Sequence, residues 1–301
     1  MNIPDVTPQL PSRSWRTILG ALSRLPQGAL SRSFGRIADI RLPVAVRRPV
    51  LGVFARGVGI DLSEAELPLE EYGSLNDFFV RRLRPGIRKW PEEEGVLASP
   101  VDGIMGQLGI VTGGRAVQAK GRWYSAAELL GDDAEASRFE GGSFLTIYLS
   151  PRHYHRIHAP AAGHIHVARH LPGLLLPVNE AAVAHVPDLF SRNERLLCHI
   201  DGPLGRVGVV AVGAYNVGRI SAAFDREWNA PDDSGSWVTN RSGLAPATHH
   251  YDPAVQLALG DELMAFHLGS TVVLLLEPGA PPLRDDLKPG QPVSLGERLT
   301  S

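Results

Sequence analysis

From about residue 96 to the C-terminus, the chain is a succession of short apolar runs separated by Gly, Pro and Asp. Among these runs are SFLTIYLS, RVGVVAVGAYNVGRIS and STVVLLLEP. Runs of about four to eight residues, rich in branched and aromatic side chains and bounded by turn residues, are typical of β-strands. The pattern therefore predicts a β-rich domain of sandwich or barrel type.

The first 90 residues have a helical pattern instead. In SWRTILGALSRL, residues 14–25, apolar side chains recur every three to four positions, with Ser14 as a cap before the helix and Pro26 after it. The stretch SLNDFFVRRLRPG further on is also helix-like. We therefore expect an α+β protein, with a helical region over residues 1–90 and a β-rich domain over residues 91–301.

Bulk composition excludes several classes of protein. The 301 residues are 44% hydrophobic and 21% charged, which is ordinary for a globular chain. The net charge of −2 gives no reason to expect a nucleic-acid partner. A single cysteine, Cys198, excludes an internal disulfide and fits a reducing compartment. The sequence shows neither an apolar run of about 18 residues nor the uninterrupted apolar core of a signal peptide.

Positive charge is concentrated at the N-terminus. Residues 1–50 hold eight arginines against two aspartates, a net charge of +6. A basic amphipathic stretch can lie on an anionic membrane surface, but helices packed on their own domain look similar. The pattern alone leaves both interpretations open.

A polar segment rich in Gly and Pro, NAPDDSGSWVTNRSGLAPATH, spans residues 229–249. Its composition predicts a long surface loop, and such loops often act as lids over a functional site.

Histidines are clustered between residues 153 and 170, where six occur. One interpretation is a metal site, although the single cysteine and the lack of an HExxH helix argue against it. The other is acid–base chemistry, in which a histidine takes a proton from a serine and a carboxylate supports it. The cluster consists of His153, His155, His158, His164, His166 and His170.

Two further residues fit the acid–base interpretation. Ser270 follows a glycine in FHLGST, which leaves the neighbouring carbonyl open to attack, and Asp102 lies in the turn SPVDG. Each also has an ordinary explanation as a turn residue. The sequence lacks a GxSxG elbow, so the usual serine-hydrolase template does not fit.

Seven motifs in one order resemble those of the phosphatidylserine decarboxylases, which are pyruvoyl-dependent lipid enzymes. The resemblance covers most of the chain from about residue 60. The motifs are LNDFFVRRLRPGIR (75–88), SPVDG (99–103), AKGRWYS (119–125), YLSPRHYHRIHAP (148–160), PDLFSRNERLLCHID (187–201), VGAYNVGRI (212–220) and LGST (268–271).

The resemblance implies that the chain cuts itself between Gly269 and Ser270. The Ser270 hydroxyl would attack the Gly269 carbonyl, and elimination would leave a pyruvoyl group at the start of a fragment spanning residues 270–301. The residues that match the family's self-cleavage triad are Ser270, His158 and Asp102. His155 matches the histidine thought to assist decarboxylation or reprotonation.

The same resemblance implies the reaction and its setting. Phosphatidylserine would form a Schiff base with the pyruvoyl group, lose CO2 and leave as phosphatidylethanolamine, without a metal. The partners would be the lipid, an anionic membrane surface and the two fragments of the proenzyme. In a bacterium, the basic N-terminal region would hold the protein peripherally on the cytoplasmic face of the cell membrane. The sequence leaves a homodimer open.

The chain departs from the family pattern at His153, where an aspartate is common, and at Tyr215, where a smaller residue is common. Three alternatives remain. They are the same fold with another amine substrate, an uncleaved lipid-binding homologue, and a conventional serine hydrolase. The intact Asp102, His158, Gly269 and Ser270 favour the decarboxylase.

Overall fold

The computed structural model describes residues 33, 35–119, 122–214, 219–229, 239, 243–267 and 270–301. The helix expected over residues 14–25, most of the 229–249 segment, Tyr215 and Gly269 lie outside these residues.

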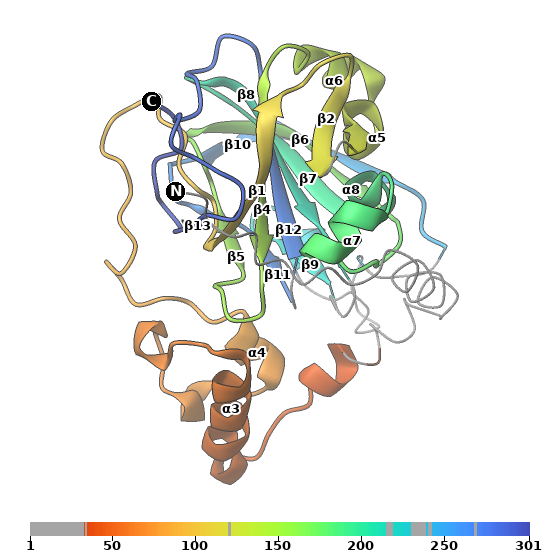
Figure 1. Cartoon of the computed structure of the whole chain (residues 1–301). Coiled ribbons are helices and arrows are strands. Elements are labelled where there is room, and N and C mark those ends of the chain that lie inside the picture. Colours follow the sequence, from red (N-terminus) through yellow and green to blue (C-terminus); the bar gives the residue numbers. More distant parts are fainter. Residues whose placement is uncertain are drawn as a thin grey trace, which may run out of the picture.

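The N-terminal region is helical, as predicted. It contains α3 (Val44–Val58), the short helices η1 (Leu62–Glu64) and η2 (Leu69–Glu71), and α4 (Leu75–Phe79). Ser74 caps the start of α4, because its hydroxyl accepts the backbone N–H of Asp77. Figure 1 shows this region at one end of the molecule, next to β5 and β11.

This region has a small core of its own. α3 buries Leu51 and Ala55, and its C-terminal cap is Gly59, whose φ of 81° is a left-handed conformation that glycine adopts readily. The buried members of this core are Leu51, Ala55, Ile60, Tyr72 and Phe78.

The rest of the chain is β-rich, and its main element is an open antiparallel sheet in the order β10-β6-β7-β8-β12-β4-β1-β13. The fold-class prediction, a helical N-terminal region followed by a β-rich domain, is confirmed. The strands of this sheet are β1 (Gly103–Ile110), β4 (Ser143–Leu149), β6 (Gly163–Leu171), β7 (Arg195–Gly202), β8 (Gly205–Val212), β10 (Ala247–Leu257), β12 (Ser270–Leu276) and β13 (Pro292–Val293).

Smaller elements surround this sheet. A three-stranded sheet has the order β5-β11-β9, and β2 pairs with β3. The strands are β2 (Arg115–Ala119), β3 (Arg122–Ser125), β5 (Arg156–His158), β9 (Ile220–Ala222) and β11 (Glu262–Phe266), and the helices are α5 (Ala126–Leu130), α6 (Asp133–Arg138), α7 (Glu180–His185), α8 (Leu189–Arg192) and α9 (Arg226–Asn229).

The strand β12 lies at the centre of the large sheet, between β8 and β4. Every residue of its sequence STVVLLL is buried. A continuous apolar run is what a strand covered on both faces requires.

The bounds of the loop predicted over residues 229–249 are wrong, because Asn229 is the last residue of α9 and β10 begins at Ala247.

The chain changes sheets directly before β12. The strand β11 pairs with β5 and β9 in the three-stranded sheet and ends at Phe266. Ser270 then opens β12 in the large sheet. The expected cleavage site therefore lies where the chain passes from one sheet to the other.

Candidate active site

Ser270 is the first residue of β12, and its backbone pairs with Leu149 at the end of β4. The residue is 0% exposed. Its hydroxyl has no hydrogen-bond partner among the residues that the structure describes. An unpaired buried hydroxyl is uncommon, because burial without a partner is unfavourable, so such a group needs a functional or structural explanation.

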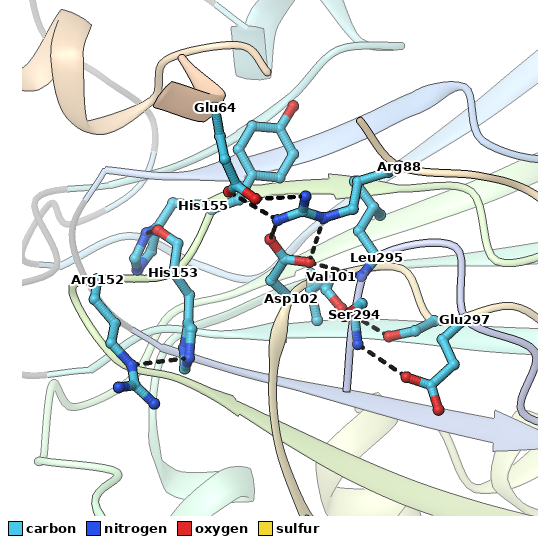
Figure 2. Close-up of polar contacts among 12 residues, drawn as sticks. Glu64, Arg88, Val101, Asp102, Arg152, His153, His155, Ser294, Leu295 and Glu297 are labelled. Atoms are coloured by element: carbon cyan, nitrogen blue, oxygen red, sulfur yellow. Dashed lines mark hydrogen bonds and ion pairs between the residues drawn. The ribbon is translucent and has the colours of Figure 1, made fainter. Parts of the chain in front are cut away.

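Asp102 lies in the turn before β1 and is held from two sides. Arg88 donates from Nε to Oδ1 at 2.9 Å and from Nη2 to Oδ2 at 2.6 Å. The backbone N–H of Leu295 donates to Oδ1 at 2.7 Å. Figure 2 shows that Arg88 also binds Glu64, through two hydrogen bonds of 2.9 Å. Asp102 is therefore part of a chain of charges that begins in the N-terminal region.

His158 ends β5 with both ring nitrogens occupied. Nδ1 donates to the carbonyl oxygen of Gly260 at 2.8 Å, so the proton of the neutral ring is on Nδ1. Nε2 then accepts from the hydroxyl of Tyr154 at 3.0 Å. Burial lowers the pKa of His158, which keeps the ring neutral and Nε2 able to accept a proton.

His158 and Asp102 lie close together without a direct bond. The backbone N–H of His158 donates to the carbonyl of Pro100 in the SPVDG turn at 2.9 Å. A polar cavity of about 230 Å³ is lined by both His158 and Arg88, the partner of Asp102. Across the described part of the chain, however, hydrogen bonds join His158 neither to Asp102 nor to Ser270.

His155 is fully buried, and its ring centroid lies 4.1 Å from that of Phe79. Nδ1 donates to the carbonyl of His153 at 2.8 Å, and Nε2 has no partner among the described residues. Burial lowers the pKa of His155 to about 3, so the ring is neutral. Its carbonyl accepts the N–H of Phe266, the last residue of β11, at 2.9 Å. His155 is thus attached to the strand that leads to Ser270.

An apolar cavity of about 570 Å³ lies against the large sheet. Thr271 lines it, together with Tyr148 from β4 and Val183 from α7. Thr271 is buried, and its hydroxyl has no partner among the described residues. Since successive strand residues point to opposite faces, Ser270 faces away from this cavity while its neighbour faces into it.

Comparison with known proteins decides the family. The sequence model described as phosphatidylserine decarboxylase matches residues 75–301. The chain is 48% identical to a phosphatidylserine decarboxylase proenzyme of Anaeromyxobacter sp. (strain K), over 94% of this chain and 98% of that protein. The protein of the same name from Myxococcus xanthus is 40% identical, with the same coverage. The chain belongs to the phosphatidylserine decarboxylase family. Its members are carboxy-lyases.

The structure explains how this decarboxylase-family chain accommodates His153 in place of the common aspartate. His153 Nδ1 accepts the backbone N–H of Ser150 at 3.0 Å, as a carboxylate oxygen could. The ring proton is then on Nε2, so the contact with Arg152 Nε at 3.4 Å, drawn in Figure 2, is between two donors and adds little. Burial and Arg152 lower the pKa of His153. The imidazole of His153 therefore provides the hydrogen-bond acceptor that an aspartate would provide, but not the negative charge of an aspartate.

The histidine cluster is dispersed in this family member. His164 and His166 are exposed on β6, and His170 is buried against Glu194 at 2.8 Å. Within the described ranges, no group of three or more His, Cys, Asp and Glu side chains is arranged to hold a metal ion.

Three residues near the site, Arg88, Tyr154 and His267, were not predicted as functional from the sequence. Arg88 and Tyr154 lie inside motifs quoted for the resemblance, and His267 directly precedes the motif LGST. Position in a motif was therefore the available signal for Arg88 and Tyr154, but it did not show which side chain each would contact.

Proposed function

We propose that this chain is a proenzyme that cuts itself between Gly269 and Ser270 and then decarboxylates phosphatidylserine to phosphatidylethanolamine. The observation that carries the proposal is Ser270, a buried hydroxyl without a described partner, on the first residue of a central strand. Family membership supplies the reaction class, and the names of the relatives supply the substrate and the proenzyme form.

Self-cleavage begins with attack of Ser270 Oγ on the carbonyl carbon of Gly269. The C–O bond of an ester forms, the peptide C–N bond breaks, and the Ser270 nitrogen becomes an amine. Removal of the Ser270 α-proton then expels the Gly269 carboxylate and leaves a dehydroalanine. Addition of water and loss of ammonia convert it into a pyruvoyl group on residues 270–301.

His158 is the base in this scheme, because its neutral ring keeps the proton on Nδ1 and a lone pair on Nε2. To reach Ser270, Nε2 must exchange the Tyr154 hydroxyl for the serine hydroxyl. Burial raises the pKa of Tyr154, so its hydroxyl remains a donor that can hold the ring until then. Asp102 acts on His158 through its charge. Burial lowers the pKa of His158, and the charge of Asp102 is one of the effects that raise it.

The residues present fit a pyruvoyl group derived from Ser270. Such a group supplies a ketone for the substrate amine and an electron sink for the bond to CO2. His155 is the proposed proton donor or acceptor for that group, because its Nε2 has no partner among the described residues and its carbonyl accepts the N–H of Phe266, four residues before Ser270. The apolar cavity beside Thr271 suits one acyl chain of the lipid.

The helix α3 supports contact with a membrane. Val46, Val50 and Val53 form a stripe at helical spacing, with exposed fractions of 39%, 45% and 63%. Arg56, in the last turn of the same helix, is exposed and contributes positive charge. No helix in the described ranges is long and apolar enough to cross a membrane. We place the protein on the membrane surface, and in a bacterium on the cytoplasmic face of the cell membrane, with the helical region over residues 1–90 as the membrane-associating part and residues 91–301 as the catalytic domain.

The deciding experiment is intact mass spectrometry of the purified wild-type chain and of Ser270→Ala. Wild type should give fragments 1–269 and 270–301, the smaller without a free N-terminal amine, and should release CO2 from phosphatidylserine. Ser270→Ala should stay whole and inactive. A wild-type chain that stays whole in the presence of membranes would instead favour the uncleaved lipid-binding alternative.

Membrane contact has its own test, flotation of the full chain with vesicles. Wild type should float with vesicles that contain anionic lipid, and the double variant Val50→Asp, Val53→Asp should float at least about tenfold less. Equal flotation of the two proteins would remove α3 from the membrane contact.

A further inference from the structure

His267 directly follows the last position of β11 and lies three positions before Ser270. It is 8% exposed. Its Nδ1 lies 2.9 Å from Oδ1 of Asn76 in α4, and its Nε2 lies 3.1 Å from the hydroxyl of Ser221 in β9. Both partners are buried as well. The ring thus joins the strand before the cleavage site to two other elements.

The chemistry of the partners determines the protonation of this ring. A side-chain amide oxygen can only accept, so Nδ1 of His267 carries the proton, and Nε2 accepts the hydroxyl hydrogen of Ser221. Burial and the nearby charge of Arg219 lower the pKa of His267 well below its usual value. The ring is therefore neutral, and each of its two nitrogens makes a hydrogen bond that helps to fix this segment of the chain.

The backbone at His267 is held too. Its N–H donates to the carbonyl of Arg219 at 3.0 Å. The guanidinium of Arg219 binds Asp39 of the N-terminal region through hydrogen bonds of 2.6 and 2.7 Å. The N-terminal region is thus connected to this position twice, through Asn76 and through Asp39.

On the other side of the cleavage site, the chain is held by the large sheet. Ser270 pairs with Leu149, and Thr271 pairs with both Tyr148 and Val212. Two residues, 268 and 269, connect these two fixed positions across the change of sheet. Attack on the preceding carbonyl needs the hydroxyl and the carbonyl at a defined separation and angle, and a displacement of about 1 Å can slow such a reaction by about 100-fold.

We propose that His267 is a positioning residue for self-cleavage, which fixes the N-terminal side of the Gly269–Ser270 bond through Asn76 and Ser221. This inference rests on the proposed function and adds residues to it. His267 touches neither reacting atom in this scheme and acts through the placement of the Gly269 carbonyl.

The test measures the rate of self-cleavage of the full chain by pulse–chase in cell-free translation. Labelled methionine marks both the proenzyme and the large fragment, because all three methionines precede residue 270. Ser221→Ala and Asn76→Ala should each slow cleavage by about tenfold, and His267→Leu by about 100-fold. Ser221→Ala removes only one oxygen atom and is the variant least disposed to misfold.

Three readouts separate positioning from a general loss of structure. Ser221→Thr, which keeps the hydroxyl, should cleave within about threefold of wild type. The pH at which the rate is half-maximal should stay the same in Ser221→Ala, with only the plateau lowered. The control His170→Asn removes another buried histidine, 1% exposed, on β6, three strands from β12, and should cleave at the wild-type rate.

Several outcomes would overturn the proposal. His267→Leu could cleave at the wild-type rate, or His170→Asn could slow cleavage as much as the variants near the site do. A shifted or absent pH dependence in His267→Asn would mean that this ring is itself the base. If the wild-type chain is never cut, the proposed function fails first, and the Ser270→Ala comparison identifies that case.

Discussion

Arg88 holds Asp102 through two hydrogen bonds, of 2.9 Å from Nε and 2.6 Å from Nη2, and donates two more hydrogen bonds to Glu64. The side chains of Arg88 and Asp102 are 17% and 11% exposed, so this is a largely buried ion pair. Such a pair contributes little net stability, but removing one partner leaves a buried charge without compensation.

Arg88→Leu should therefore destabilise the uncut protein by about 3–5 kcal/mol, because Asp102 and Glu64 lose the cation that they share. The measurement is denaturant unfolding of the Ser270→Ala background, in which no cleavage complicates the transition. As a control, Arg41→Gln breaks an ion pair with Asp77 in which Arg41 is 78% exposed, and it should change stability by less than about 0.5 kcal/mol. Similar losses in the two variants would show that Arg88 does not hold a buried charge.

The pKa of His158 predicts the pH dependence of self-cleavage. Burial lowers this pKa below the ordinary value of 6.5, so the ring stays unprotonated and basic as the pH falls through 6.5. The cleavage rate should hold its plateau at pH 6.5 and decline only in more acidic solution. Quenched time courses between pH 4 and pH 9 would locate the decline, and a midpoint at or above 6.5 would contradict a buried neutral base.

His155 should make folding stability depend on pH. Burial depresses its pKa in the folded protein to about 3, against an ordinary value of 6.5, so the unfolded chain binds the extra proton between these values. Stability is fully present above pH 6.5 and is lost as the pH falls toward 3, by about 1.4 kcal/mol per pH unit. In the Ser270→Ala background, His155→Gln should lose about 2 kcal/mol less than its parent between pH 7 and pH 5. Equal losses would mean that the ring is not buried in its neutral form.

The sequence was sufficient to predict the elements whose signal is local. The strand β12 follows from an uninterrupted apolar run, and the β-rich texture after residue 96 follows from short runs between turn residues. The motifs also identified Asp102, His158 and Ser270 as candidates. What they could not give is the partner of each side chain, because His267 and Asn76 lie 191 residues apart and meet only through packing.

The 229–249 segment shows a second reason why prediction from the sequence is incomplete. Its polar and Gly/Pro-rich composition hides the start of β10, an edge strand at Ala247 whose alternating exposure lets polar residues such as His250 face outward. The change of sheet at FHLGST is equally invisible in the sequence. A glycine between two apolar runs looks the same whether the second strand returns to the first sheet or joins another.

His153 offers a direct test of the departure from the common aspartate. His153→Asp should keep the acceptor for the Ser150 N–H, so we expect cleavage within about threefold of wild type. His153→Leu removes that acceptor, which should cost about 1–2 kcal/mol of stability and slow cleavage, because Ser150 follows the strand partner of Ser270. Pulse–chase and unfolding of both variants would check this. If His153→Leu cleaves like wild type, the turn at Ser150 does not matter for the reaction.

The last prediction concerns the cavity beside Thr271 and the acyl chains of the substrate. Val183 lines this cavity and is only partly buried, so Val183→Trp should fill it without disturbing the sheet. We expect KM for dioleoyl-phosphatidylserine to rise by about tenfold, since each buried methylene contributes about 0.8 kcal/mol. KM for the dihexanoyl lipid should change by less than about twofold, because short chains do not need the cavity. The control Leu174→Trp adds the same ring at a position that is 42% exposed and outside the cavity lining. If Val183→Trp raises KM equally for both lipids, the cavity holds no acyl chain and the variant has disturbed the site itself.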